Sequence, residues 1–312
     1  MNPSPTATHL IGQTPVVQLP FRLEGITLHA KCEFLNPSGS IKDRFARAVV
    51  DDAERRGELR PGKIILECSS GNTGVALAML GAVRGYRVKI ALSEKASRER
   101  RQLIEHFGGE VITFPAGGYR AGIELTQRMA AEDDRYFLPR QFENPLNAHD
   151  HEITGAELIR QIPQGIDAFV AGYGTGGTLA GVSRALRARY SRVSIYAMEP
   201  AEAALLQGEA PCTHFIEGVA DGFVPALLKP VKLDGAIKVS SAEATQMARR
   251  LAREFGLLVG TSSGANVAAA LKIAEKMERS HTVATLLCDR AERYFSTRLF
   301  GNAIGEGHSV AI

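Results

Sequence analysis

Continuous apolar runs alternate with longer amphipathic segments over most of this chain. Runs such as IILEC and VATLLC are typical of strands buried on both faces of a parallel sheet. Such runs predict strands at Leu28–Glu33, Lys63–Glu67, Val88–Leu92, Glu110–Phe114, Ala168–Gly172, Val193–Met198 and Thr282–Cys288. The amphipathic segments predict helices at Lys42–Arg56, Thr73–Arg84, Ser97–Phe107, Ala121–Ala131, His151–Gln161, Thr178–Arg189, Ala242–Phe255 and Ala265–Arg279. This alternation indicates an α/β fold built from βαβ units with right-handed crossovers.

Two turn-rich stretches, Asn36–Gly39 (NPSG) and Asn144–Asn147 (NPLN), are the best candidates for domain boundaries. A length of 312 residues suits two domains at ~150 residues per domain. We expect a smaller domain over residues 38–148, inserted in a larger one made of residues 1–37 and 149–312. Each would hold a mostly parallel, twisted sheet flanked by helices.

Composition and charge remove several classes of function. The net charge is +3 without a dense basic block, so no nucleic-acid or acidic-membrane partner is expected. The longest apolar stretch, Val75–Val83, is far shorter than the ~20 residues that span a bilayer, and MNPSPTATHLIG is no signal peptide. The four cysteines are isolated, so we expect a cytoplasmic protein with neither disulfide framework nor metal site. The basic cluster Arg98–Arg101 is interpreted as a solvated helix face.

The segment Asn36–Arg44 (NPSGSIKDR) is typical of a turn that leads into a helix. Ser40 is placed to cap that helix, and Lys42 then falls in its first turn. The helix dipole disfavours a cation there, which favours the neutral amine that Schiff-base chemistry requires. The alternative is a surface lysine in a basic helix, beside Arg44 and Arg47, and this segment alone favours neither interpretation.

The segment Glu67–Gly74 (ECSSGNTG) joins a strand to a helix through six consecutive small or polar residues. Such a loop offers backbone N–H groups, hydroxyls and the positive end of a helix to a small anion. A carboxylate fits as well as a phosphate. Helix capping alone does not need so many small residues, so the segment predicts an anion site.

The segment Gly172–Thr178 (GYGTGGT) opens the helix that follows the expected strand at 168–172. It matches neither the dinucleotide fingerprint nor a P-loop, but its glycines, threonines and helix N-terminus predict a phosphate cup. The strand-to-helix turn Gly260–Ala265 (GTSSGA) by itself indicates only a helix cap.

Together and in this order, the four segments resemble the cysteine synthase/cystathionine β-synthase family of pyridoxal-phosphate (PLP) enzymes. Gln141–Pro145 (QFENP) and Cys288–Tyr294 (CDRAERY) also match, and the likeness runs from about Ile11 to Gly301. The resemblance implies the fold of the tryptophan synthase β-subunit, PLP as cofactor and a homodimer. It assigns substrate binding to the smaller domain and cofactor binding to the larger one.

The resemblance also implies roles for individual residues. Lys42 would be the catalytic residue, which holds PLP as a Schiff base and moves the α-proton once substrate displaces it. Asn72 would bond the ring hydroxyl oxygen, and Ser262 would face the pyridine nitrogen. A serine stabilises a protonated ring less than an aspartate does, which favours prompt loss of a β-leaving group. The phosphate would be bound by Gly174, Thr175, Gly176, Gly177 and Thr178. The substrate carboxylate would be held by Ser69, Ser70, Gly71, Thr73 and Gln141.

The implied reaction is a β-replacement, via α-aminoacrylate, that forms L-cysteine from O-acetyl-L-serine or O-phospho-L-serine and sulfide or another sulfur donor. Cystathionine β-synthase activity, a different nucleophile in a specialised pathway, and a PLP-binding paralogue without turnover are the alternatives. Departures from the family pattern at Cys68, Ser69, Ala291 and Glu217–Val219 leave the activated serine and the nucleophile open. A complex with a serine acetyltransferase also stays open.

Overall fold

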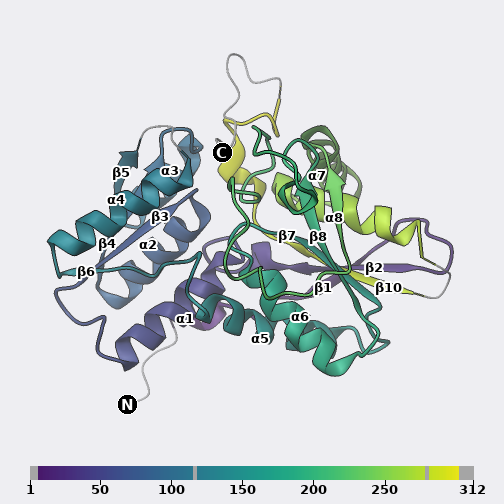
Figure 1. Cartoon of the computed structure of the whole chain (residues 1–312), viewed down its shortest axis with the longest axis horizontal. Helices are drawn as coiled ribbons and strands as arrows, with labels where there is room; N and C mark the ends of the chain where they lie inside the picture. The colour runs from purple at the N-terminus through teal and green to yellow at the C-terminus, as the bar shows by residue number, and fades with distance from the viewer. Residues whose placement is uncertain (1–5, 115–117, 278–280, 302–312) are drawn as a thin grey trace.

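Two separate sheets organise the chain in the computed structural model, which describes residues 6–114, 118–277 and 281–301 (Figure 1). The larger sheet has six strands in the order β1-β2-β10-β7-β8-β9, and every neighbouring pair is parallel except β1 with β2. The smaller sheet has four parallel strands in the order β5-β4-β3-β6. The predicted α/β class, with two mostly parallel sheets, is confirmed.

The strands of the larger sheet are β1 Val16–Leu19, β2 Thr27–Cys32, β7 Ala168–Gly172, β8 Ser194–Pro200, β9 Gly235–Val239 and β10 Thr282–Leu287. Those of the smaller sheet are β3 Ile64–Ser69, β4 Arg87–Ser93, β5 Glu110–Phe114 and β6 Tyr136–Phe137. Strands β3 and β10 are buried along their whole length, as expected for central strands covered on both faces.

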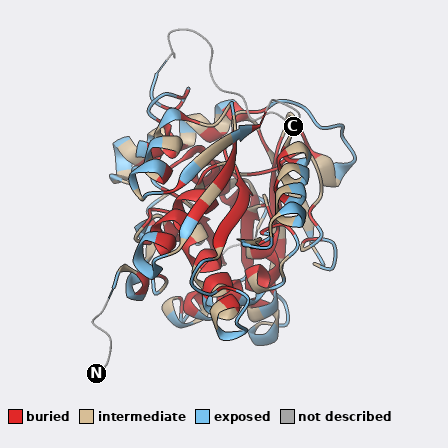
Figure 2. Cartoon of the chain, turned by 90° about the vertical axis from the view of Figure 1, so that its left-hand side faces the viewer, coloured by how far each residue is buried: buried red, intermediate tan, exposed pale blue. Residues whose placement is uncertain are grey.

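Helices cover both faces of each sheet. In the larger sheet α7 and α8 pack on one face and α5 and α6 on the other; in the smaller sheet α1, α2 and α3 pack on one face and α4 on the other. Figure 2 shows buried residues along the strands and exposed residues on the outer helix surfaces. The helices are α1 Lys42–Arg55, α2 Asn72–Arg84, α3 Arg98–His106, α4 Tyr119–Glu132, α5 Leu146–Gln161, α6 Gly177–Arg189, α7 Ser241–Phe255 and α8 Thr261–Ala274. None of these helices is long and apolar enough to cross a membrane.

Several elements differ from the sequence predictions. Strands β1, β6 and β9 were not predicted, because they are short, partly exposed edge strands without a continuous apolar run. Helix α5 begins at Leu146 rather than His151, and α8 at Thr261 rather than Ala265, because polar residues fill their first turns. The predicted end of the last helix, Arg279, lies outside the described residues.

All four strands of the smaller sheet come from residues 64–137, within the range 38–148 expected for the smaller domain. The larger sheet takes its strands from residues 16–32 and 168–287. The domain boundaries themselves remain a proposal.

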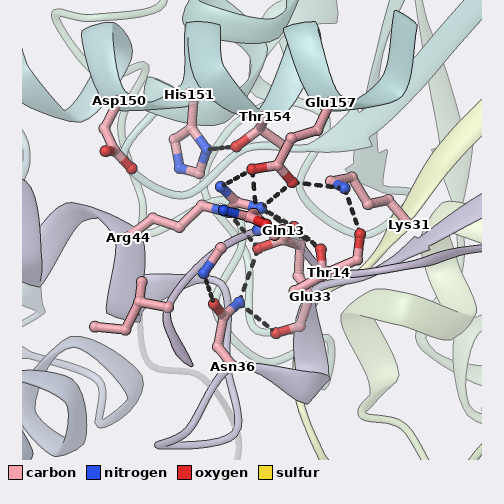
Figure 3. A network of polar contacts seen from close by, with 12 residues as sticks. Gln13, Thr14, Lys31, Glu33, Asn36, Arg44, Asp150, His151, Thr154 and Glu157 are labelled. Carbon is pink, nitrogen blue, oxygen red and sulfur yellow. Dashed lines mark hydrogen bonds and ion pairs between the residues drawn. The ribbon is translucent and has the colours of Figure 1, made fainter. Parts of the chain in front are cut away.

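A buried cluster of charged side chains ties helix α1 to strand β2 and helix α5 (Figure 3). Arg44 donates hydrogen bonds to both carboxylate oxygens of Glu33, at 2.7 and 2.8 Å, and to both of Glu157, at 3.0 and 2.7 Å. Lys31 pairs with Glu157 at 2.8 Å. Burial raises the pKa of Glu157, but hydrogen bonds and charge from Arg44 and Lys31 outweigh it and lower that pKa to about 2. Because Arg44 lies two residues after Lys42, the cluster anchors the first turn of α1, which begins at Lys42.

Candidate active site

The four glycine-rich segments converge on one cavity, which takes its lining from the ends of strands in both sheets. This is where parallel α/β sheets bind ligands. Of the predicted site residues, those that line it are Lys42, Ser70, Asn72, Thr73, Gln141, Gly174, Thr175, Gly176, Thr178 and Ser262. Ser69, Gly71 and Gly177 lie in the same loops without lining the cavity.

Lys42 is the first residue of α1 and lines the cavity. The turn before it is fixed against the end of β10, because Ile41 N–H donates to the Cys288 carbonyl at 2.9 Å. Arg290 N–H donates to the Gly39 carbonyl at 3.1 Å in the same contact. The expectation that Ser40 is the N-cap was wrong by one residue, since Ile41 holds that position. The Ser40 hydroxyl instead accepts the backbone N–H of Lys42 at 3.3 Å.

The loop before α2 presents Ser70 and Thr73 to the cavity. The Ser69 hydroxyl accepts the N–H groups of Gly71 and Gly74, at 3.0 and 3.1 Å, so it holds the loop together from within. Thr73 donates its hydroxyl to Gln141 Oε1 at 2.6 Å, and Gln141 Nε2 donates to a backbone carbonyl of β3 at 2.7 Å. Thr73 and Gln141 therefore form one rigid pair at the cavity wall.

The N-terminus of α6 meets the cavity without a side chain at its N-cap, Gly176. The Gly177 N–H donates to the Thr175 hydroxyl at 3.4 Å, and the N–H groups that follow it in the first turn are available to an anion. A side chain at Gly174 would place its Cβ atom only 2.6 Å from the Gly218 carbonyl oxygen, so this position requires glycine. The Thr175 hydroxyl accepts from Asn147 at 3.0 Å, and the Thr178 hydroxyl lies 3.2 Å from His151 Nε2. Burial, followed by nearby cations, lowers the pKa of His151 well below its usual range, so this ring is neutral.

Ser262 lies in the first turn of α8, which is tied to the strands beside it. The Asn266 side chain accepts the N–H of Gly172 at 2.7 Å and donates to the Leu286 carbonyl at 3.0 Å. The Ser263 hydroxyl accepts the N–H of Cys288 at 2.8 Å. These bonds join α8 to the ends of β7 and β10, which leaves Ser262 at the cavity.

Charged residues around the site were missed by sequence reasoning. The Asn72 amide donates to Asp289 at 2.6 Å and accepts from Arg293, and both partners lie in the CDRAERY motif. The interpretation of Arg98–Arg101 as a solvated face was wrong for Arg100, which is 2% exposed and pairs with Glu217 at 2.9 Å. No local sequence pattern indicates that Arg100 is buried, because its partner Glu217 lies far away in the sequence, between β8 and β9.

Glu67, within β3, is 5% exposed and accepts backbone N–H groups from Cys68 at 2.9 Å and Gln141 at 3.2 Å. Burial raises its pKa from 4.5 to about 8, against the effect of those bonds. Between pH 4.5 and about 8 the folded protein therefore holds a proton that the unfolded chain has lost. The stabilising contribution is fully present below pH 4.5, falls steadily across this window and is gone above about 8.

We expect the free energy of unfolding to fall between pH 6.5 and about 8, as measured by urea denaturation. In Glu67→Gln, which cannot titrate, this part of the profile should be flatter. A stability that rises with pH across this window in the unaltered protein, or a slope that survives Glu67→Gln, would contradict the assignment.

The donor groups at the cavity fit PLP. Lys42 offers an amine for its aldehyde, the uncapped N-terminus of α6 suits its phosphate, and Asn72 and Ser262 offer groups for the ring. Residues 7–289 match the family described as "Pyridoxal-phosphate dependent enzyme".

Known proteins agree with this match. A cysteine synthase of Staphylococcus aureus is 41% identical over 302 residues, which cover 96% of this chain and 97% of that protein. The structure of the O-acetylserine-dependent cystathionine β-synthase of Helicobacter pylori superposes with a TM-score of 0.92 at 33% identity, covering 96% of this chain and 100% of that one. The structure of an O-ureido-L-serine synthase gives 0.91 at 40% identity, covering 96% of each chain. The chain therefore belongs to the pyridoxal-phosphate-dependent enzymes, as a β-replacement enzyme of the cysteine synthase/cystathionine β-synthase family.

Proposed function

We propose that this enzyme forms L-cysteine from O-acetyl-L-serine and sulfide. One observation carries the proposal: the Lys42 amine, the loop before α2 and the N-terminus of α6 meet at a single cavity. An amino acid with a good β-leaving group suits this arrangement, because one helix end can take its carboxylate while the lysine reaches its α-carbon. O-Phospho-L-serine is the second candidate for the activated serine.

The residues proposed to hold the cofactor each act on a different part of it. Lys42 would bind its aldehyde carbon, Asn72 its ring hydroxyl and Ser262 its pyridine nitrogen. When bound, PLP supplies an electron sink for the α-carbon of the amino acid. The phosphate would be held by Gly174, Thr175, Gly176, Gly177 and Thr178.

The substrate is proposed to bind on the side of the smaller sheet. There Ser70 and Thr73 would take its carboxylate together with Gln141, in a loop held in shape by Ser69 and Gly71. The Thr73–Gln141 hydrogen bond of 2.6 Å keeps both groups in place before substrate arrives. The Lys42 amine, once released from the cofactor, removes the proton of the α-carbon and later returns one.

We further propose a homodimer that acts in the cytoplasm, on the strength of the family resemblance. A complex with a serine acetyltransferase forms no part of this proposal.

Replacement with a thiol, as in a cystathionine β-synthase, is the runner-up reaction. A specific observation favours it: the loop Glu217–Asp221 brings carboxyl groups to the cavity. The relatives include a cystathionine β-synthase and an O-ureido-L-serine synthase, so the nucleophile varies among proteins of this structure.

The visible spectrum of the full-length, PLP-loaded protein tests the proposed substrate. We expect a yellow protein whose absorption band moves to longer wavelength when O-acetyl-L-serine is added without a nucleophile, and persists there. Sodium sulfide should restore the starting spectrum and release L-cysteine. If the band does not change with O-acetyl-L-serine but does with O-phospho-L-serine, O-phospho-L-serine is the substrate instead. A protein that takes up no PLP would contradict the proposal.

A further inference from the structure

The carboxyl group of Asp221 is a polar group at the cavity for which the roles above give no use. Asp221 is 7% exposed and lines the same cavity as Lys42 and Ser262. Its Oδ1 atom has no hydrogen-bond partner among the described residues. Its Oδ2 atom lies 3.2 Å from the position that a Cβ atom would take at Gly174. A buried carboxyl oxygen without a partner is costly, so its retention beside a ligand cavity points to a ligand group.

The backbone holds Asp221 in place through a strained neighbour. Ala220 has a φ of +49°, in the left-handed region that residues with a side chain rarely adopt. Its N–H donates to the Tyr173 carbonyl at 2.7 Å, directly before the phosphate cup. The same loop is fixed at Glu217, whose carboxylate pairs with Arg100 at 2.9 Å. Strain that surrounding bonds maintain at a cavity is typical of functional groups.

The groups that face Asp221 come from several elements. Burial raises the pKa of Asp221 to about 6, the charge of Lys42 on α1 lowers it, and that of Glu217 in the same loop raises it. Tyr119 on α4 and Cys68 on β3 also face it, and burial keeps the pKa of both well above the usual range. At neutral pH, Asp221 is therefore a carboxylate between two neutral groups, with poor solvation and the capacity to accept a proton.

We propose that Asp221 is a further catalytic residue, which accepts the proton of the nucleophile as that nucleophile attacks the β-carbon of the substrate. The inference rests on the proposed β-replacement of O-acetyl-L-serine. It adds a second class of nucleophile to sulfide, namely neutral thiols.

The step balances without any further reactant. The ester oxygen of O-acetyl-L-serine leaves as acetate with the electrons of the Cβ–O bond, and Lys42 holds the proton taken from the α-carbon. The thiol then gives its proton to Asp221 Oδ1, and the sulfur electron pair forms the new bond to the β-carbon. Lys42 returns a proton to the α-carbon, and Asp221 releases its own to solvent. The ester and the thiol are thereby converted into a thioether amino acid, acetate and one proton.

The position of a carboxylate here selects the kind of nucleophile. A thiol with a pKa of ~8.5 arrives protonated at neutral pH and attacks well only as the thiolate. A base beside the β-carbon supplies that thiolate where it is needed. Hydrosulfide already carries a negative charge and gains nothing from the base, and an ionised Asp221 repels it.

A two-stage measurement on the full-length, PLP-loaded enzyme tests the proposal. O-Acetyl-L-serine is added first, and the absorption band that results is then discharged with sodium sulfide, 2-mercaptoethanol or L-homocysteine from pH 5 to 8. In the unaltered enzyme the discharge rate with thiols should fall on the acid side of about pH 6. In Asp221→Asn the break near pH 6 should be lost, and the rate with thiols should instead follow the thiolate fraction, which falls about tenfold per pH unit over the whole range. At pH 6 the rate with thiols should drop about 100-fold, at least 10-fold more than the rate with sulfide.

Asp221→Glu should recover part of the thiol rate, because it restores the carboxylate. Asp51→Asn is the matched control, since Asp51 pairs with Arg84 on the outer surface and lies outside the cavity lining. The absorbance of bound PLP in each variant shows that the cofactor is held. Equal losses with thiols and sulfide in Asp221→Asn, or an unchanged break near pH 6, would overturn the role of Asp221. An unaltered enzyme whose band ignores O-acetyl-L-serine would instead overturn the proposed substrate, and O-phospho-L-serine then serves for the comparison.

Discussion

Lys42→Ala is expected to lower turnover by about a thousandfold or more, because the variant loses both covalent attachment of the cofactor and the base at the α-carbon. Among the residues that line the cavity in the described part of the chain, Lys42 alone carries an amine. No described neighbour can therefore take over its chemistry.

Borohydride reduction gives a readout that is independent of activity. Reduction of the PLP-loaded enzyme should fix the pyridoxyl group on the peptide that contains Lys42, as seen by mass spectrometry, and Lys42→Ala should carry no label there. Lys276→Ala is the control, since Lys276 is exposed beyond the end of α8. Full turnover in Lys42→Ala, or a label on another lysine of the unaltered enzyme, would refute the assignment.

Arg44→Ala should lower the free energy of unfolding by about 3–5 kcal/mol, because it leaves two buried carboxylates without their shared partner. Both Glu33 and Glu157 lose hydrogen bonds of 2.7–3.0 Å in this variant. Arg44→Lys should recover only part of the loss, because an ammonium group cannot bridge two carboxylates with a planar fork.

Urea denaturation of the unaltered protein and the variants measures this effect. Arg55→Ala is the matched control in the same helix, since the Arg55 side chain is 73% exposed in its pair with Asp52. Exposed pairs contribute about 0–1 kcal/mol, so its stability should stay close to that of the unaltered protein. If Arg44→Ala cost no more than Arg55→Ala, the buried cluster would not be a structural anchor of α1.

The sequence predicts best those elements in which every residue has the same degree of burial. Strands β3 and β10 lie between helix layers, so every position is buried and every residue except Glu67 is apolar or small, which makes the run visible. Strand β9 lies at the edge of its sheet with most positions half-buried, and no run of letters marks it. Helix α8 was predicted to begin four residues too late, because its first turn, from Thr261, has the small and polar residues of a loop.

The candidate site divides in the same way. The glycine-rich loops at 67–74 and 172–178 are contiguous, and each carries its own signal for a helix N-terminus that faces an anion, whereas Gly260–Ala265 by itself indicated only a helix cap. Arg100 and Asp221 have no such signal, since their burial depends on contacts between segments far apart in sequence. A charged residue in a polar helix gives no sign of being buried until its partner, here Glu217, is known.

Gly71 and Arg100 show how closely such distant segments can depend on each other. A Cβ atom at Gly71, whose φ is +142°, would lie 2.2 Å from Arg100 Cδ. The arginine cannot move away freely, because it bonds Ser97 at 2.8 Å and Glu217 at 2.9 Å. The effects of substitutions at these two positions should therefore not be additive, since the missing side chain at one makes room for the other. A side chain introduced at Gly71 would therefore need a compensating change at Arg100, so the loop before α2 and helix α3 can be redesigned only together.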